Sequence, residues 1–342
     1  GNPLAPGLAW HDPRGITEPI LKELGDFEFR ARAGALLNEI ASISKTLWLN
    51  KNFPESKKAK HFLSAPEWVA YSLGAEIVNE LSLVSRTGFF DVESRKPWEE
   101  AIALVSGSKD YLGRLVVAGE PIGIVNNQAP ENLRGAVITI AGHDHFTAAY
   151  YCGAINEGSL FDSMGTAEAL LRTFKAPLTR EAIAELAAAN VGLSCSVIAD
   201  HYTLLGALPT GLTLERACAL VGVATREEKI ALGEAALKID PSASAMRVVN
   251  DYYGLSVTNL DDAVSPAALF RATVQHLVDD SSEMVALIEK FTGKAQNVVI
   301  AGGWINNPVI AAAKEKQYGT FRVSDATEAG ATGAAEFAGI AA

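Results

Sequence analysis

The chain has 342 residues, of which 49% are hydrophobic and 20% charged, and its formal net charge is −11. This length exceeds that of a usual single domain and predicts two domains. The acidic balance argues against a general nucleic-acid or anionic-membrane surface, because such surfaces need clustered Lys and Arg. The densest basic cluster, Lys57–Lys60, is expected to be a solvated loop.

The cysteines and the ends of the apolar runs bear on where the protein works. Cys152, Cys195 and Cys218 are an odd number, widely spaced in apolar contexts, which predicts reduced core cysteines rather than disulfides or metal ligands. No apolar run reaches the length of a membrane span, and the first residues lack a signal-peptide pattern. We therefore expect a soluble, cytoplasmic protein that binds neither nucleic acid nor membrane. A homodimer is the default assembly.

The first half of the chain shows both helical and strand patterns. Apolar residues at helical spacing predict helices over Glu18–Gly25, Glu28–Ile43, Ser44–Asn50, Ser64–Leu73 and Pro97–Val105. The helix at Ser64 has the clearest start, because a proline lies in its first turn and Glu67 stands three residues beyond the cap. Apolar, β-branched runs predict strands within Leu115–Asn126 and over Gly135–Ala141. This half is therefore expected to be mixed α/β.

The second half begins near Glu157 and repeats this mixture. Its helices are predicted over Arg180–Ala189, Thr213–Val221, Thr225–Ile239, Ser265–Thr292, Asn307–Gln317 and Thr327–Ala341. Its strands are predicted over Ser159–Met164, Glu168–Phe174, Val191–Ile198, Asn297–Ala301 and Thr320–Val323. The helix from Ser265 is the clearest, with Pro266 at its first position and Gly293 just past its end. The last helix is unusually rich in Gly and Ala, which suits close backbone packing.

The stretch Ala141–Leu171 carries the chemistry. Asp144 follows the strand at Gly135–Ala141 and opens a helical segment, and ligands of an open α/β sheet bind beyond the carboxyl ends of its strands. Farther on, Gly165-Thr166 forms a turn between two apolar strands, which lets the backbone approach a phosphate. One acid and one phosphate cradle in a single stretch suggest phosphoryl transfer.

A second polar pattern lies near the start of the chain. Trp10, Asp12 and Arg14 alternate, so an extended segment would place them on one face. They could form a surface loop with Asp12 paired to Arg14. They could also border a small polyol or sugar, since an aromatic face covers C–H groups while charged groups bond hydroxyls. Both interpretations stay open on the pattern alone.

Taken together, these residues resemble the FGGY carbohydrate kinases. Six segments carry the resemblance in the right order: Pro3–Arg14, Asn79–Trp98, Gly119–Gly123, Ala141–Leu171, Ala301–Pro308 and Thr327–Ala335. The resemblance implies an actin-like ATPase (ribonuclease H-like) fold with two α/β domains around a cleft. Residues 1–156 would be the remainder of the sugar-binding N-terminal domain, and residues 157–342 the nucleotide-binding C-terminal domain.

The resemblance also implies roles for particular residues. The reaction would be ATP-dependent phosphorylation of a ketose or polyol hydroxyl, with ATP and Mg²⁺ as cofactors and Asp144 as the general base. The binding residues implied are Trp10, Asp12 and His145 for the sugar, and Gly165, Thr166, Gly302, Gly303 and Asn307 for the nucleotide. The Gly142–His145 turn is most similar to that of fuculose-kinase-like members.

Two departures from the family pattern lead to alternatives. Family members begin with a strand and an Asp-x-Gly-Thr phosphate loop that this chain does not contain; Asp162–Thr166 imitates it with one residue too many. We therefore expect a first domain without its leading strands. The second departure is Gly254–Ser265, where relatives have a different loop. One alternative is a catalytically impaired, kinase-like binding protein. The other is a metal-dependent hydrolase that uses His143, Asp144 and His145.

Overall fold

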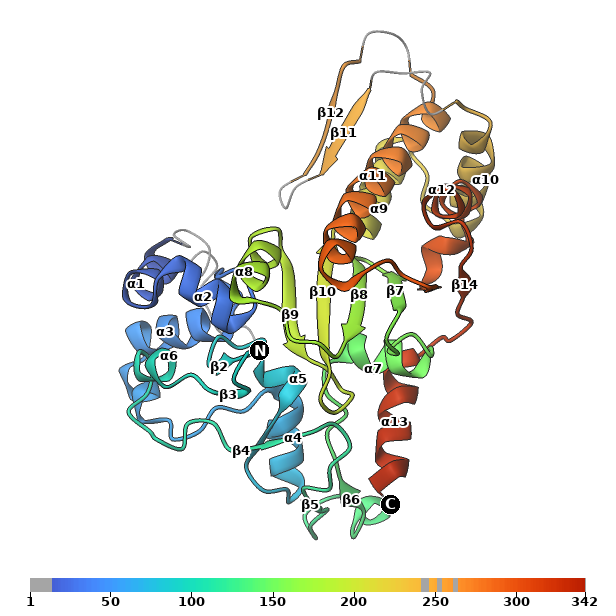
Figure 1. Cartoon of the computed structure of the whole chain (residues 1–342). Coiled ribbons are helices and arrows are strands. Elements are labelled where there is room, and N and C mark those ends of the chain that lie inside the picture. Colours follow the sequence, from blue (N-terminus) through green and yellow to red (C-terminus); the bar gives the residue numbers. More distant parts are fainter. Residues whose placement is uncertain (1–13, 241–245, 251–253, 261–263, 342) are drawn as a thin grey trace. The chain divides into compact units, whose positions relative to one another are not determined.

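The computed structural model describes residues 14–240, 246–250, 254–260 and 264–341. They form two compact units (Figure 1). The first contains described residues up to 151 together with 173–204 and 328–341, and the second contains 152–172 and the described residues of 205–327. Two strands, β8 (Glu168–Phe174) and β10 (Tyr202–Leu208), contribute residues to both units.

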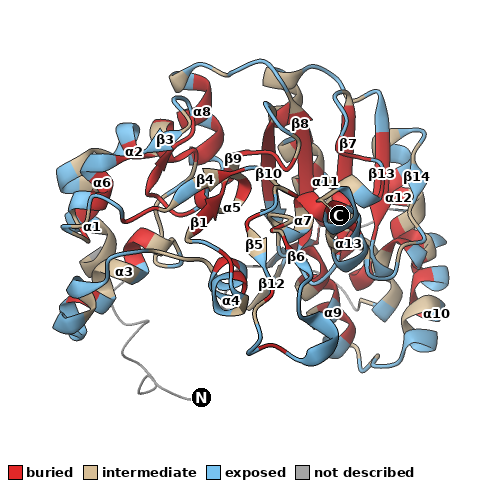
Figure 2. Cartoon of the chain, turned by 90° about the horizontal axis from the view of Figure 1, so that it is seen from below, coloured by how far each residue is buried: buried red, intermediate tan, exposed pale blue. Residues whose placement is uncertain are grey.

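The units interleave along the sequence because the last helix packs in the first unit. Helix α13 (Ala329–Ala341) lies beside α7 (Asp144–Tyr151) (Figures 1 and 2). A β-carbon at Gly333 would stand 2.5 Å from the Thr147 carbonyl oxygen, so the small-residue helix allows the close backbone packing that we predicted. The rings of Tyr150 and Phe337 pack against each other in a tilted arrangement nearby, with centroids 4.6 Å apart. The functional division into 1–156 and 157–342 stays a prediction.

Short elements dominate the first unit. Its helices are α1 (Arg14–Leu24), α2 (Asp26–Ala33), α3 (Ser42–Asn52), α4 (Ala65–Leu73), α5 (Leu81–Val84), α6 (Glu99–Ala103), α7, α8 (Arg180–Ala188) and α13, with 3₁₀ turns at Pro54–Lys58 and Glu131–Leu133. Its strands are β1 (Val78–Glu80), β2 (Phe90–Asp91), β3 (Lys96–Pro97), β4 (Arg114–Val116), β5 (Gly123–Ile124), β6 (Val137–Ile138) and β9 (Val191–Cys195). Strands β1 and β4 pair in parallel, while β2–β3 and β5–β6 pair antiparallel.

Two predictions for this unit need correction, and one is confirmed. The helix expected over Glu28–Ile43 ends at Ala33, because Gly34 adopts a left-handed conformation that stops it. The strand expected over Gly135–Ala141 is only two residues long, since only Val137 and Ile138 pair with β5. Helix α4 starts as predicted, and the Glu67 carboxylate accepts the Ser64 N–H at 2.6 Å.

The second unit is built on the strands β14-β13-β7-β8-β10, which lie in this order in a six-stranded sheet. Its strands are β7 (Ser159–Met164), β11 (Arg247–Asn250), β12 (Leu255–Thr258), β13 (Asn297–Ala301) and β14 (Arg322–Val323). Its helices are α9 (Thr210–Leu220), α10 (Arg226–Leu237), α11 (Pro266–Thr292) and α12 (Pro308–Tyr318), with a 3₁₀ turn at Gly303–Asn306. Strands β7 and β13 are parallel, and β7–β8 is the antiparallel hairpin predicted around Gly165-Thr166.

The inner strands of this sheet are buried on both faces. Strands β7, β8 and β13 are almost entirely buried (Figure 2), so any charge within them needs a partner inside the protein. Helix α11 begins as predicted, with the Ser265 hydroxyl accepting the Ala268 N–H at 3.2 Å. No helix in the part of the chain that the structure describes is long and apolar enough to cross a membrane.

Candidate active site

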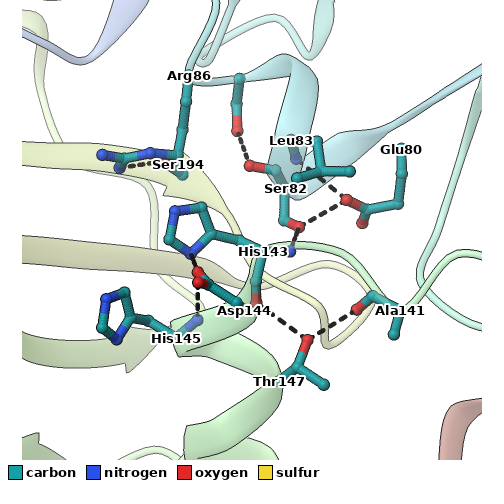
Figure 3. Close-up of polar contacts among 11 residues, drawn as sticks. Glu80, Ser82, Leu83, Arg86, Ala141, His143, Asp144, His145, Thr147 and Ser194 are labelled. Atoms are coloured by element: carbon teal, nitrogen blue, oxygen red, sulfur yellow. Dashed lines mark hydrogen bonds and ion pairs between the residues drawn. The ribbon is translucent and has the colours of Figure 1, made fainter. Parts of the chain in front are cut away.

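The turn that precedes α7 is held in place by its neighbours in the first unit (Figure 3). Gly142 has φ +93°, and a β-carbon there would overlap the Ser82 hydroxyl, so both the backbone angle and the space require glycine. The His143 N–H donates to Ser82 Oγ at 2.9 Å. On the other side, the Thr147 hydroxyl donates to the His143 carbonyl at 3.0 Å. These contacts fix the backbone immediately before Asp144.

Asp144 is the first residue of α7, and its side chain is 83% exposed. Its Oδ1 accepts the His145 N–H at 2.8 Å, and it lies at a helix N-terminus, which favours negative charge. His143 Nδ1 lies 3.2 Å from the same oxygen without hydrogen-bond geometry. The carboxylate is therefore oriented by the backbone but remains open to an approaching hydroxyl.

Two basic side chains flank this carboxylate. Burial, followed by the positive charge of Arg86, lowers the pKa of His143 to about 4, so its imidazole is neutral at pH 7. The rings of His143 and His145 lie nearly parallel, with centroids 5.8 Å apart. The Arg86 guanidinium donates to Ser194 Oγ at 3.4 Å and interacts electrostatically with Asp144 (Figure 3). Within the described residues, Arg86 forms no ion pair closer than 4 Å.

A buried acidic network supports the turn from behind. Ser82 Oγ donates to Glu80 Oε2 at 2.6 Å, and the Leu83 N–H donates to the same oxygen at 3.0 Å. Burial raises the pKa of Glu80 to about 7. The Glu80 N–H in turn donates to Glu67 Oε1 at 2.8 Å, and Asn79 Nδ2 donates to Glu67 Oε2 at 2.9 Å. The chain Glu67–Glu80–Ser82 thus connects the start of α4 to the His143 backbone.

Sequence reasoning located part of this site. His143, Asp144 and His145 lie at the start of α7, and their site roles stay predictions, whereas Trp10 and Asp12 lie outside the described residues. Sequence reasoning did not single out Arg86, Ser82 or Glu80, although all three lie within the quoted segment Asn79–Trp98. The available signal was an acidic residue, Glu80, at the end of the short strand β1.

The three residues of the hydrolase alternative do not form a metal centre. Across the described ranges, no group of three or more His, Cys, Asp or Glu side chains is arranged to hold a metal ion. His143 directs Nδ1 toward Asp144 rather than toward a point shared with His145, whose ring lies roughly parallel to its own. The geometry therefore gives no support to that alternative.

The second unit contains a pocket of about 480 Å³ beside the β7–β8 turn and the start of α12. The nucleotide-side residues predicted from the sequence that line it are Gly165, Gly303 and Asn307. Its other lining residues are Met164, Glu215, Arg226, Lys229, Ile230, Trp304 and Asn306. Thr166 and Gly302 are exposed and directly adjoin lining residues in the chain. The structure therefore brings two segments, separated by over a hundred residues, to one pocket.

Close backbone contact joins the two loops of this pocket. Gly302 has φ +103°, and a β-carbon there would overlap the Met164 carbonyl oxygen, so the strand end of β13 meets the end of β7 backbone to backbone. The Asn307 amide donates to the Lys229 carbonyl at 2.8 Å, and its Oδ1 is buried without a hydrogen-bond partner among the described residues. Asn307 therefore connects α10 to the start of α12 while it lines the pocket.

The residue that imitates a phosphate-loop aspartate is not available to a ligand. Asp162 is completely buried, and its Oδ2 lies 2.8 Å from Lys314 Nζ. The Asp162–Thr166 segment therefore contributes its turn, and not its aspartate, to the pocket.

Comparison with known proteins agrees with these observations. Residues 1–150 match the N-terminal domain of the FGGY family of carbohydrate kinases. A gluconokinase from Bacillus subtilis (strain 168) is 26% identical over 213 residues, which are 60% of this chain and 39% of the relative. An L-fuculokinase from Escherichia coli (strain K12) is 25% identical over 177 residues, 50% of this chain and 37% of the relative. The matched part therefore spans less than half the length of either relative.

The structural comparison extends the similarity beyond the residues that match by sequence. The crystal structure of a xylulose kinase from Rhodospirillum rubrum matches with a TM-score of 0.84 and 16% identity, over 95% of this chain and 68% of that chain. The chain thus has the mixed α/β, actin-like ATPase fold that the sequence predicted. The sequence similarity to the FGGY carbohydrate kinases rests on residues 1–150, which match the N-terminal domain of that family, and on the gluconokinase and the L-fuculokinase.

Proposed function

We propose that the protein transfers the γ-phosphoryl group of ATP to a hydroxyl of a small sugar, with Asp144 as the general base. The observation that supports this most strongly is the geometry of Asp144. Its carboxylate is exposed, yet the turn before it is held by the Ser82 and Thr147 hydroxyls. A general base must be accessible to the hydroxyl proton, and it must be held in a fixed position. The exposed carboxylate on a fixed turn meets both requirements.

The reaction divides into three movements of atoms. Asp144 accepts the proton of the sugar hydroxyl as the hydroxyl oxygen forms a bond to the γ-phosphorus, and the bond from that phosphorus to the bridging oxygen breaks to release ADP. Because His143 is neutral at pH 7, its imidazole does not cancel the negative charge of the base. Positioning and charge neutralisation of the phosphates supply most of the acceleration in such reactions.

We assign the nucleotide to the pocket of the second unit. Gly165, Thr166, Gly302 and Gly303 offer a backbone that a phosphate can approach closely, and Asn307 lines the same pocket. Mg²⁺ binds proteins through one or two carboxylates together with substrate phosphates. The only carboxylate that lines the pocket in the described part of the chain is Glu215, which is paired with Lys229 at 2.7 Å. These residues do not form a metal site by themselves, so we derive no step through the metal.

We assign the sugar to the surface around Asp144. His145 adjoins the base in the structure, and Trp10 and Asp12 remain proposed sugar-binding residues from the sequence. Arg86 joins them, because its guanidinium interacts electrostatically with Asp144 and forms no ion pair within 4 Å among the described residues. The relatives named above are a gluconokinase and an L-fuculokinase, so the substrate class that we propose is a sugar, ketose or sugar acid of five or six carbons. A cytoplasmic location supplies the ATP.

Sugar-dependent release of ADP from Mg-ATP tests this function. Ketoses, polyols and sugar acids are each mixed with the protein, and ADP is measured with a coupled assay, alongside calorimetric titration of the protein with Mg-ADP. We expect at least one sugar to raise ADP release well above the sugar-free rate. Binding of ADP without sugar-dependent turnover by any compound would contradict the kinase function and favour the kinase-like binding protein.

A further inference from the structure

A buried lysine lies behind the pocket of the second unit. Lys314 is on α12, and its side chain is 1% exposed. Its ammonium lies 2.8 Å from Asp162 Oδ2 and 2.6 Å from Glu168 Oε1, and both carboxylates are also buried. It donates hydrogen bonds to Glu168 Oε1 and, at 3.0 Å, to Ser281 Oγ. The ammonium therefore has three oxygen neighbours inside the protein.

Hydroxyl groups as well as the lysine contact the two carboxylates, while Asp162 Oδ1 is buried without a hydrogen-bond partner among the described residues. The Tyr318 hydroxyl donates to Asp162 Oδ2 at 2.9 Å, and the Thr210 hydroxyl donates to Glu168 Oε2 at 2.6 Å. The Ser281 hydroxyl donates to Glu168 Oε1 at 2.8 Å. These partners come from α9, α11 and α12, so the cluster ties three helices to the β7–β8 hairpin.

The position of the cluster relates it to the pocket. Asp162 and Glu168 lie on the two strands that flank the Gly165-Thr166 turn, and Glu168 pairs with Met164 in the hairpin register. Lys314 lies on the helix that begins directly after Asn307, on the opposite loop of the pocket. One ammonium group therefore links both segments that line the pocket, without contacting the pocket itself.

Stability alone does not explain why this cluster is charged. Removing charges from water costs several kcal/mol per ion, and well-packed apolar residues often replace a buried ion pair without loss of stability. A buried ion pair does impose directional contacts, which apolar side chains cannot. The geometry it fixes here is the distance between the β7–β8 turn and the start of α12.

We propose that Lys314, acting through Asp162 and Glu168, is a positioning residue that sets the spacing of the two loops of the nucleotide pocket. The inference rests on the proposed nucleotide site. It adds to that site a residue that does not touch the ligand.

The test combines a charge-balanced double variant with nucleotide titration. K314M/E168Q removes one positive and one negative charge, keeps the hydroxyl partners of position 168, and leaves Asp162 with the Tyr318 hydroxyl. K316M is the matched control, since Lys316 is an exposed residue of the same helix. We expect the double variant to stay folded by circular dichroism and to bind Mg-ADP about tenfold or more weakly, as small misplacements of binding groups do. K316M should bind as the wild type does.

Hydrogen exchange and the wild-type Mg-ADP titration distinguish a failure of the inference from a failure of the proposed nucleotide site. Hydrogen exchange without nucleotide should rise in the double variant over 164–167 and 302–307, and stay unchanged in K316M. A folded double variant with wild-type ADP affinity and wild-type exchange would overturn the inference while leaving the nucleotide site intact. Failure of the wild type to bind Mg-ADP would instead remove the site itself, and the inference with it.

If the double variant does not fold, two conservative variants test the positioning role of Lys314 instead. T210V and Y318F each remove one hydrogen bond to a carboxylate of the cluster without changing its charge. Weaker Mg-ADP binding and faster exchange at the two loops in either variant would support the inference. Wild-type values in both would overturn it.

Discussion

The Ser82 hydroxyl accepts the N–H of His143 at 2.9 Å and donates to the buried carboxyl of Glu80 at 2.6 Å (Figure 3). One small side chain thus joins the backbone of the proposed base turn to a buried acidic group. The order of the base turn should therefore depend on residues that never contact a substrate. The first three predictions concern this connection.

Replacing Ser82 with alanine should destabilise the protein by about 1–3 kcal/mol. The variant leaves the His143 N–H without its acceptor and removes one of the two hydrogen bonds to Glu80 Oε2, and buried polar groups that lose a partner cost this much. Urea unfolding measures the change. S72A is the control, because Ser72 is exposed and donates only to the carbonyl one helical turn before it. An equal effect of S72A and S82A would contradict the structural role of Ser82.

Gly142→Ala should destabilise the protein by about 1–3 kcal/mol or more and slow sugar phosphorylation. The added β-carbon overlaps the Ser82 hydroxyl and stands 2.8 Å from Val197 Cγ1, in a backbone conformation unfavourable to alanine. Gly107→Ala is the control, since a β-carbon there meets no atom within 4 Å. Thermal unfolding and turnover are measured on both variants. A G142A protein as stable and active as G107A would show that the turn is not constrained as described.

Glu80 makes stability fall as the pH rises. Burial raises the pKa of this carboxyl in the folded protein to about 7, above the ordinary value of 4.5. The folded state therefore binds the proton more tightly, and this contribution is complete below about pH 4.5 and lost as the pH rises through 7. The difference corresponds to about 3 kcal/mol.

The variant E80Q tests this dependence, because glutamine stays neutral at every pH. At pH 5 it should unfold close to wild type, and at pH 8 it should be more stable by about 3 kcal/mol. Asp162, whose pKa burial also raises to about 7, keeps a residual slope of the same sign in E80Q. Glu234, an exposed residue of α10, supplies the control E234Q. Parallel curves for wild type and E80Q between pH 5 and 8 would contradict the prediction.

Local patterns in the sequence predicted the elements that carry the site. The β7–β8 hairpin and β13 begin and end where predicted, because apolar strands bounded by Gly and Asn leave little ambiguity. The β10 strand was missed, since its continuous apolar run, YTLLGAL, fits a buried helix segment equally well. For these strands, the hydrophobic pattern predicted the type of element where flanking residues also marked the two ends of the strand.

The contacts that hold the site could not be predicted in the same way. Ser82 and His143 are 61 residues apart, and Glu168 and Lys314 are 146 residues apart. A charge inside an apolar strand, such as Asp162, indicates that a partner exists but does not say where it lies in the sequence. For this reason Asp162 was interpreted as part of an imitated phosphate loop, whereas tertiary packing makes it the buried partner of Lys314.

The kinetic effect of D144N tests the central claim most directly. Asparagine keeps the shape of the side chain and can still accept the His145 N–H, but it cannot take a proton from the sugar hydroxyl. We predict that kcat for sugar-dependent ADP release falls about 10²–10⁴-fold, the usual contribution of a general base. Affinity for Mg-ADP should stay at the wild-type value. A D144N protein that retains wild-type kcat would contradict the assignment of Asp144 as the base.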